Sequence, residues 1–257
     1  MRLAAIVTGP PTDRPPLLIA HGLFGSAKNW GAIAKRLALH RQVISVDMRN
    51  HGDSPRSAEH GYAAMAGDLA ETIAGGRADV LGHSMGGKAA MMLALTEPER
   101  VRRLIVADMA PVAYGHSQME YVRAMQALDL AAVTRRSDGD AGLAAGVPQP
   151  ALRAFLLQSL AVEEGGARWK LNLDALAAEM PEIMGFPGTR ASFPGPTLFL
   201  TGASSDYVRP AHWPRIRALF PAATHEAIPD AGHWLHADAP NAFIGVVSAF
   251  LDAPGPA

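Results

Sequence analysis

The pentapeptide Gly82-His83-Ser84-Met85-Gly86 stands between two apolar stretches of different length. The stretch before it, Ala78–Leu81, is typical of a short buried strand, and Lys88–Leu95 after it is typical of a helix. A G-x-S-x-G sequence between a strand and a helix predicts a nucleophile elbow, which exposes the serine hydroxyl at the end of a sheet. Glycines suit so sharp a turn because side chains would block it. We therefore expect Ser84 to be a nucleophile rather than part of a turn that only packs a helix on a sheet.

The composition is that of a soluble globular protein. The chain has 257 residues, 49% of them hydrophobic and 18% charged, which is enough for one large α/β domain with an insertion. The formal net charge is −1 without a block of either sign, which argues against nucleic acid or an anionic membrane as partner. There is no cysteine, so disulfides, thiol nucleophiles and thiolate metal sites are excluded.

The location expected from the sequence is cytoplasmic. The apolar stretch at the N-terminus is too short for a signal peptide. No window approaches the about 18 apolar residues of a transmembrane helix. The absence of cysteine fits a reducing compartment.

Short apolar runs alternate with longer helical patterns, which predicts an α/β fold with a mostly parallel sheet flanked by helices. Continuous apolar character predicts strands buried on both faces. The predicted strands are Leu17–Ala20, Val43–Asp47, Ala78–Leu81, Leu104–Asp108, Thr197–Thr201 and Thr224–Ile228, with Leu3–Val7 as a further edge strand. The predicted helices are Trp30–Leu39, Tyr62–Ala74, Gly87–Leu95, Pro210–Phe220 and Pro240–Leu251.

One interval breaks this alternation. Residues 111–196 show no convincing strand, only amphipathic stretches such as Glu120–Leu130, Ala151–Leu160 and Leu173–Met184, separated by glycine and proline. We expect a helical cap inserted between two late strands, with residues 1–110 and 197–257 forming the core. The last residues, 252–257, are expected to be a frayed tail.

A serine hydroxyl needs a base within hydrogen-bond reach. His233, in Ala231-Gly232-His233-Trp234, follows the last predicted strand and so lies at the same edge of the sheet as Ser84. His236 and His83 are weaker candidates, since His83 and its neighbour Ser84 should point apart on the turn.

Two carboxylates compete to orient that base. Asp206 follows the predicted strand Thr197–Thr201, and Asp108 ends the strand before it. Both strand ends lie near one site, so topology does not choose between them. The carboxylate that is not used should still lie in the pocket.

Two backbone amides are expected to bind the oxyanion of a tetrahedral intermediate. Met85 begins a helix, where its amide is unpaired, and Leu23 lies in the turn after the first buried strand. Phe24 and Trp30 are expected to line an apolar pocket. The loop Asp47–Ser54 has the wrong ligand spacing for zinc and is interpreted as structural.

Together these motifs resemble the α/β-hydrolase fold, and more narrowly the YbfF-like esterases, over nearly the whole chain. The motifs that carry the resemblance are His21–Ser26, Asp47–Gly52, Gly82–Lys88, Asp108–Val112, Trp169–Asn172 and Gly232–Trp234. The resemblance implies Ser84 as nucleophile, His233 as base, a helical cap and hydrolysis of short acyl esters or thioesters. It also favours Asp108 as the acid, with Asp206 as the alternative.

The expected partner is thus a small-molecule ester or thioester, with no cofactor and no metal. The same scaffold also hosts C–C bond hydrolases, lyases and cofactor-free haloperoxidases, which remain alternatives. A ligand-binding protein that retains a triad is a more remote one.

Overall fold

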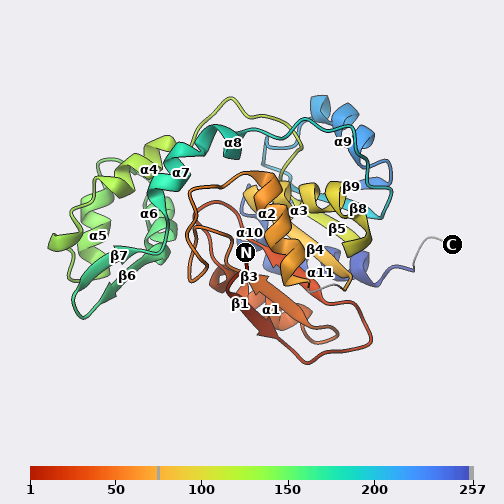
Figure 1. The fold of residues 1–257 in the computed structure, drawn as a ribbon, viewed down its shortest axis with the longest axis horizontal. Helices are drawn as coiled ribbons and strands as arrows, with labels where there is room; N and C mark the ends of the chain where they lie inside the picture. The colour runs from red at the N-terminus through yellow and green to blue at the C-terminus, as the bar shows by residue number, and fades with distance from the viewer. Residues whose placement is uncertain (74–75, 255–257) are drawn as a thin grey trace.

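The computed structural model describes residues 1–73 and 76–254, which form a seven-stranded sheet and its flanking helices (Figure 1). The sheet contains β1 (Ala5–Thr8), β2 (Leu17–Ala20), β3 (Val43–Val46), β4 (Ala78–His83), β5 (Val101–Ala107), β8 (Thr197–Gly202) and β9 (Ala223–Ile228). Their order is β1-β3-β2-β4-β5-β8-β9, and only β1 runs antiparallel to its neighbour. The predicted α/β class with a mostly parallel sheet is confirmed.

Helices cover both faces of the sheet, as crossovers between parallel strands require. The core helices are α1 (Gly31–Leu37), α2 (Tyr62–Thr72), α3 (Met85–Thr96), α9 (Trp213–Leu219), α10 (Leu235–Asp238) and α11 (Pro240–Asp252). Short 3-10 helices cover Ala27–Trp30, Pro98–Arg100, Leu130–Ala132, Leu157–Ser159 and Pro210–His212. The apolar side chains of α1 and α11 pack on one face, and those of α2, α3 and α9 pack on the other.

Three predictions about these elements differ from the structure, and two of them include residues that the structure does not describe. The last strand, β9, was expected to be buried on both faces, but only Ile228 is buried, because β9 is an edge strand with one neighbour. The predicted helix Tyr62–Ala74 ends at Thr72, and Ala74 lies outside the described residues. Of the expected tail, Asp252 is helical, and residues 255–257 are also outside the description.

Between β5 and β8 the chain leaves the sheet and forms a separate group of elements (Figure 1, green to teal). These are α4 (Met119–Gln126), α5 (Arg136–Leu143), α6 (Pro150–Leu156), β6 (Leu160–Glu163), β7 (Gly166–Trp169), α7 (Leu173–Ala178) and α8 (Met180–Met184). The expectation of no strand in residues 111–196 was wrong, because β6 and β7 pair as an antiparallel hairpin. Gly165 and Gly166 have φ of 107° and 128°, so glycines taken as helix breaks form the hairpin turn.

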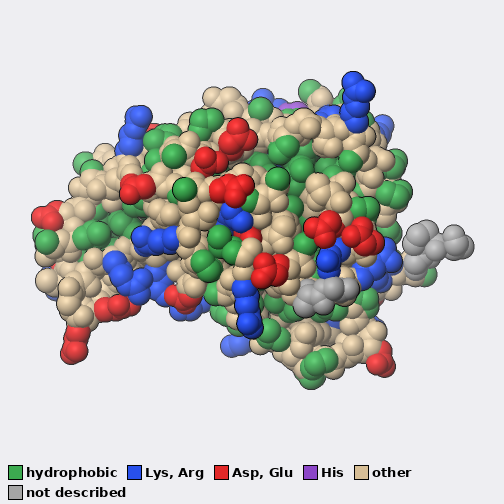
Figure 2. All heavy atoms as spheres, viewed as in Figure 1, with side chains coloured by type: hydrophobic (Ala, Val, Ile, Leu, Met, Phe, Trp, Pro, Cys, Tyr) green, Lys and Arg blue, Asp and Glu red, His purple; other side chains and the backbone are tan. Residues whose placement is uncertain are grey.

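The exposed face in Figure 2 carries acidic and basic side chains interspersed with apolar ones. Within residues 1–73 and 76–254, no helix is long and apolar enough to cross a membrane.

Candidate active site

Ser84 occupies the sharp turn between β4 and α3. Its backbone has φ 53° and ψ −119°, a conformation that residues with side chains adopt only where the surrounding structure enforces it. Glycine makes the turn possible, since a Cβ atom on Gly82 would overlap the carbonyl oxygen of Gly86, and one on Gly86 would overlap that of Ala20. Ser84 is thereby held at the carboxyl end of β4.

His233 and Asp108 meet at the same edge of the sheet. The distance from His233 Nδ1 to Asp108 Oδ2 is 2.7 Å, and Asp108 is fully buried at the end of β5. Asp108 also accepts hydrogen bonds from the backbone N–H of Gly202 (3.3 Å) and from Ser205 Oγ (2.5 Å). These donors hold the carboxylate in one orientation toward the imidazole.

Asp206, the alternative acid, is separated from this arrangement. Its side chain is 77% exposed and pairs with Arg209 Nη2 at 2.6 Å. That guanidinium lowers the pKa of Asp206. The expectation that the unused carboxylate would still lie in the pocket was wrong, because the loop after β8 points Ser205 inward at Asp108 and Asp206 outward.

The imidazole of His233 has a defined tautomer. Because Nδ1 donates to Asp108, Nε2 carries no proton in the neutral ring and is free to accept one. Tyr207 stacks on the ring with centroids 3.9 Å apart and planes 15° from parallel. The structure records no hydrogen bond from Ser84 Oγ to His233 within the described residues, and such bonds often tighten only when a substrate binds.

The two weaker histidine candidates have other contacts. His83 Nε2 donates to the carbonyl of His233 at 2.9 Å, so the ring of His83 holds the backbone of His233. His236 is buried and stacks on Trp30 with centroids 4.3 Å apart. Burial lowers the pKa of His236 to about 4.

Leu23 and Met85, the residues whose amides are predicted to bind the oxyanion, both line the cavity that contains Ser84. Met85 is the first residue of α3, where backbone N–H groups have no partner within the helix. Leu23 lines the same cavity, in a loop that is anchored by two histidines. His21 donates from Nδ1 to the carbonyl of Gly22 at 2.7 Å, and His51 Nε2 accepts from the N–H of Phe24 at 3.1 Å.

These two histidines are buried and neutral, and so is His60, whose ring centroid lies 5.6 Å from that of His51. Burial lowers the pKa of His21 to about 4 and those of His51 and His60 to about 3. A neutral ring can donate from one nitrogen and accept at the other, as His51 does between Arg49 and Phe24. The loop Asp47–Ser54 that supplies His51 is held by its own polar groups, as Asp47 accepts from the amide of Asp53 at 2.8 Å. Its structural interpretation is confirmed.

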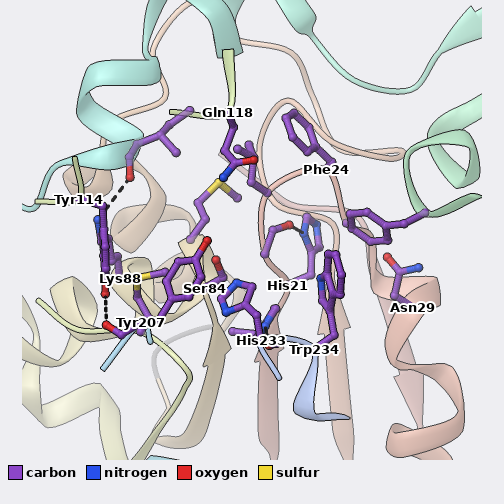
Figure 3. A pocket seen from close by; sticks show the side chains of 18 of the residues that line it. His21, Phe24, Asn29, Ser84, Lys88, Tyr114, Gln118, Tyr207, His233 and Trp234 are labelled. Atoms are coloured by element: carbon purple, nitrogen blue, oxygen red, sulfur yellow. Dashed lines mark hydrogen bonds between the residues drawn. The ribbon is translucent and has the colours of Figure 1, made fainter. Parts of the chain in front are cut away.

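A cavity of about 270 Å³ lies over Ser84, and both predicted pocket residues, Phe24 and Trp30, line it. Figure 3 shows Lys88 and Tyr114 on one side of Ser84 and His233, and Phe24 and Asn29 on the other. Further lining comes from the inserted segment: His116, Gln118, Tyr121, Leu152, Phe155, Ile183 and Met184. In the part of the chain described, no three His, Cys, Asp or Glu side chains are grouped to hold a metal ion.

Sequence reasoning missed three residues of this site. Ser205 and Tyr207 lie beside Asp206, in a loop where the sequence predicts only an acid. Lys88 is predicted only as the start of a helix, although a lysine in an apolar stretch one turn after the serine indicates a buried amine.

Comparison with known proteins agrees with this geometry. Residues 17–246 match the model of the alpha/beta hydrolase family. The chain belongs to that family. It is 43% identical to mouse sn-1-specific diacylglycerol lipase ABHD11 over 92% of this chain and 81% of the relative. It is 35% identical to Esterase YbfF of Escherichia coli, over 93% and 94% of the two chains.

A solved structure points the same way. A marine microorganism esterase superposes with a TM-score of 0.92 and 37% identity, covering 97% of this chain and 99% of the other. By these relationships the chain is an enzyme of the esterase and lipase type.

Proposed function

We propose that this alpha/beta hydrolase cleaves carboxylic esters or thioesters of short to medium acyl chains, with Ser84, His233 and Asp108 as its triad. The observation that carries the proposal is the 2.7 Å hydrogen bond from His233 to buried Asp108. Both residues lie at the carboxyl edge of the sheet, where Ser84 occupies the turn between β4 and α3. The names of the relatives, esterase and diacylglycerol lipase, support ester hydrolysis.

The reaction proceeds by two acyl transfers. Ser84 Oγ bonds to the carbonyl carbon while its proton passes to Nε2 of His233. The amides of Leu23 and Met85 stabilise the oxyanion. When the carbon–oxygen or carbon–sulfur bond breaks, His233 protonates the leaving alcohol or thiol. Water then attacks the acyl-enzyme, giving its proton to His233, and the carboxylic acid leaves as Ser84 recovers its proton.

Residues 111–196 are proposed to act as a cap on the core formed by residues 1–110 and 197–257. The support is that the segment leaves the sheet after β5, returns at β8 and supplies one wall of the cavity. Phe155 of this segment lies beside Trp234, with ring centroids 5.9 Å apart. The acyl and leaving groups would be enclosed between these two parts.

The test is steady-state hydrolysis of p-nitrophenyl esters from acetate to dodecanoate, with acyl thioesters and a diacylglycerol in parallel. We expect turnover that declines toward the long chains and is lost in Ser84→Ala. Absence of turnover on every ester and thioester would contradict the proposal. Activity only on diketones or in perhydrolysis would instead favour the C–C hydrolase or haloperoxidase alternatives.

A further inference from the structure

Lys88 is a buried amine that the proposed reaction does not use. It lies on α3 one turn after Ser84, its residue is 1% exposed, and it lines the cavity. Among the described residues no carboxylate pairs with it. Burial lowers the pKa of Lys88 to about 7, and its charged form is stable there only if its protons find acceptors. The hydrogen-bond partners of Lys88 therefore indicate its role.

Its partners are three successive carbonyl groups at the end of α8. Lys88 Nζ donates to the carbonyls of Ile183 (3.4 Å), Met184 (3.0 Å) and Gly185 (2.5 Å). A cation at a helix C-terminus satisfies carbonyls that have no partner in the helix and lies at the negative end of the dipole. Lys88 is therefore a C-terminal cap supplied by a helix far away in sequence.

Two aromatic residues strengthen the same attachment. Tyr62 Oη donates to the carbonyl of Ile183 at 2.5 Å, and the backbone N–H of Tyr114 donates to that of Met184 at 3.0 Å. The ammonium also lies 4.8 Å from the ring centroid of Tyr114 and 5.6 Å from that of Tyr62. Five hydrogen bonds from three donor groups thus converge on one short turn of the inserted segment.

That turn is part of the pocket wall. The side chains of Ile183 and Met184 line the cavity that contains Ser84. The position of this wall relative to Ser84 therefore depends on these hydrogen bonds, three of which come from Lys88 on α3, the helix that follows Ser84.

We propose that Lys88 is a positioning residue that holds the wall of Ile183 and Met184 beside Ser84 and so determines the size of acyl group the pocket accepts. This inference rests on the proposed ester hydrolysis. Without the ammonium, three carbonyls lose a donor and water or a shifted turn must replace it. The wall then moves away from α3 and the pocket widens.

The experiment measures kcat and KM of the full-length enzyme on p-nitrophenyl butyrate and decanoate for Lys88→Met, which keeps an unbranched side chain one atom shorter and removes the amine. Loss of a hydrogen bond to a charged group predicts a KM for butyrate raised about 10-fold with kcat changed less than about 3-fold. The ratio of kcat/KM for decanoate over butyrate should rise by about 10-fold.

Two further variants keep the test decisive. Tyr62→Phe removes a single donor to the same turn and should shift the ratio in the same direction by about 3-fold. The ratio measured for Tyr62→Phe tests the inference if Lys88→Met does not fold. The matched control is Lys170→Met, which removes a different contact of the inserted segment, the 2.7 Å pair with Asp53. Lys170→Met should keep the wild-type ratio.

Two results would overturn the inference. One is a wild-type ratio in both Lys88→Met and Tyr62→Phe, or in Tyr62→Phe alone if Lys88→Met does not fold. The other is a fall in kcat in Lys88→Met that is equal for both esters, which would mean that Lys88 contacts the reacting groups. Failure of the ester proposal looks different, because the wild-type enzyme would then cleave neither ester.

Discussion

The carboxyl edge of the sheet and the inserted segment line the same cavity, yet their residues are held in place differently. At the sheet edge, Ser84 and Asp108 are fixed by strained backbone at the ends of neighbouring strands, with φ of 53° and 52°. In the inserted segment, Ile183 and Met184 are held by side chains that reach across from the core. We therefore expect the chemistry of the reaction to depend on the carboxyl edge of the sheet. The choice of substrate should depend on the contacts of the inserted segment, which single substitutions can alter.

The largest loss of activity is expected on substitution of Ser84, the proposed nucleophile at the carboxyl edge of the sheet. Ser84→Ala removes the attacking oxygen and should lower kcat by about 10⁵-fold or more, while leaving the fold intact. Steady-state ester hydrolysis measures the first, and thermal unfolding the second. Ser204→Ala, at an exposed serine, is the matched control. Retained activity in Ser84→Ala would mean that the sheet edge does not carry the chemistry.

The next effect separates the two carboxylates. Asp108→Asn should lower kcat by about 10⁴-fold, because the asparagine favours the wrong tautomer of His233. Asp206→Asn should stay within about 2-fold of wild type, since it removes only an exposed pair with Arg209. The same ester assay measures both. The reverse order of effects would assign the acid to Asp206.

The fold and the main candidates for catalysis could be predicted because each depends on local sequence. Continuous apolar runs identify strands that are buried on both faces, and glycines on both sides of Ser84 identify the elbow. The acid could not be chosen in this way, since Asp108 and Asp206 both follow parallel strands that end at one edge. What separates them is spatial, namely the orientation of Ser205 and the position of Arg209.

The wall of the cavity was not predictable for a similar reason. Lys88 and the carbonyls that it binds are 95 to 97 residues apart in the chain. The backbone carbonyl is present in every residue, so no residue pattern marks these acceptors. The hairpin of β6 and β7 was missed because its strands, LAVE and GARW, are not continuous apolar runs and lie among helical patterns.

The buried histidines His21, His51 and His60 should make the fold sensitive to acid. Their pKa is near 6.5 in an unfolded chain and about 3 to 4 in the fold. Between pH 6.5 and pH 4 the unfolded chain binds more protons, so the free energy of unfolding should fall as the pH is lowered. The expected slope is at most about 1.4 kcal/mol per pH unit for each histidine.

Urea unfolding at pH 7.5, 6.5 and 5.5 measures this slope. His51→Gln should reduce it, whereas His40→Gln, at an exposed histidine, should not. A free energy of unfolding that is constant over this range would contradict the burial of neutral histidines beneath Leu23.

The smallest effect is expected where the inserted segment meets the core at the surface. Asp53→Asn breaks the 2.7 Å pair with Lys170, in which the Asp53 side chain is 59% exposed. Solvent and salt weaken such pairs, so the free energy of unfolding should change by less than about 1 kcal/mol, and kcat should not change. Urea unfolding and the ester assay test both. A large loss of activity would show that this outer contact, as well as Lys88, positions the inserted segment.

The most direct test of the central claim, that Ser84 is activated by His233 and Asp108, is labelling with a fluorophosphonate followed by peptide mass mapping. Wild-type enzyme should carry one phosphonyl group, on Ser84, and Ser84→Ala should carry none. Asp108→Asn should react much more slowly, and Asp206→Asn at the wild-type rate. Labelling of another residue, or labelling of Ser84 that is equally fast in Asp108→Asn, would contradict the account.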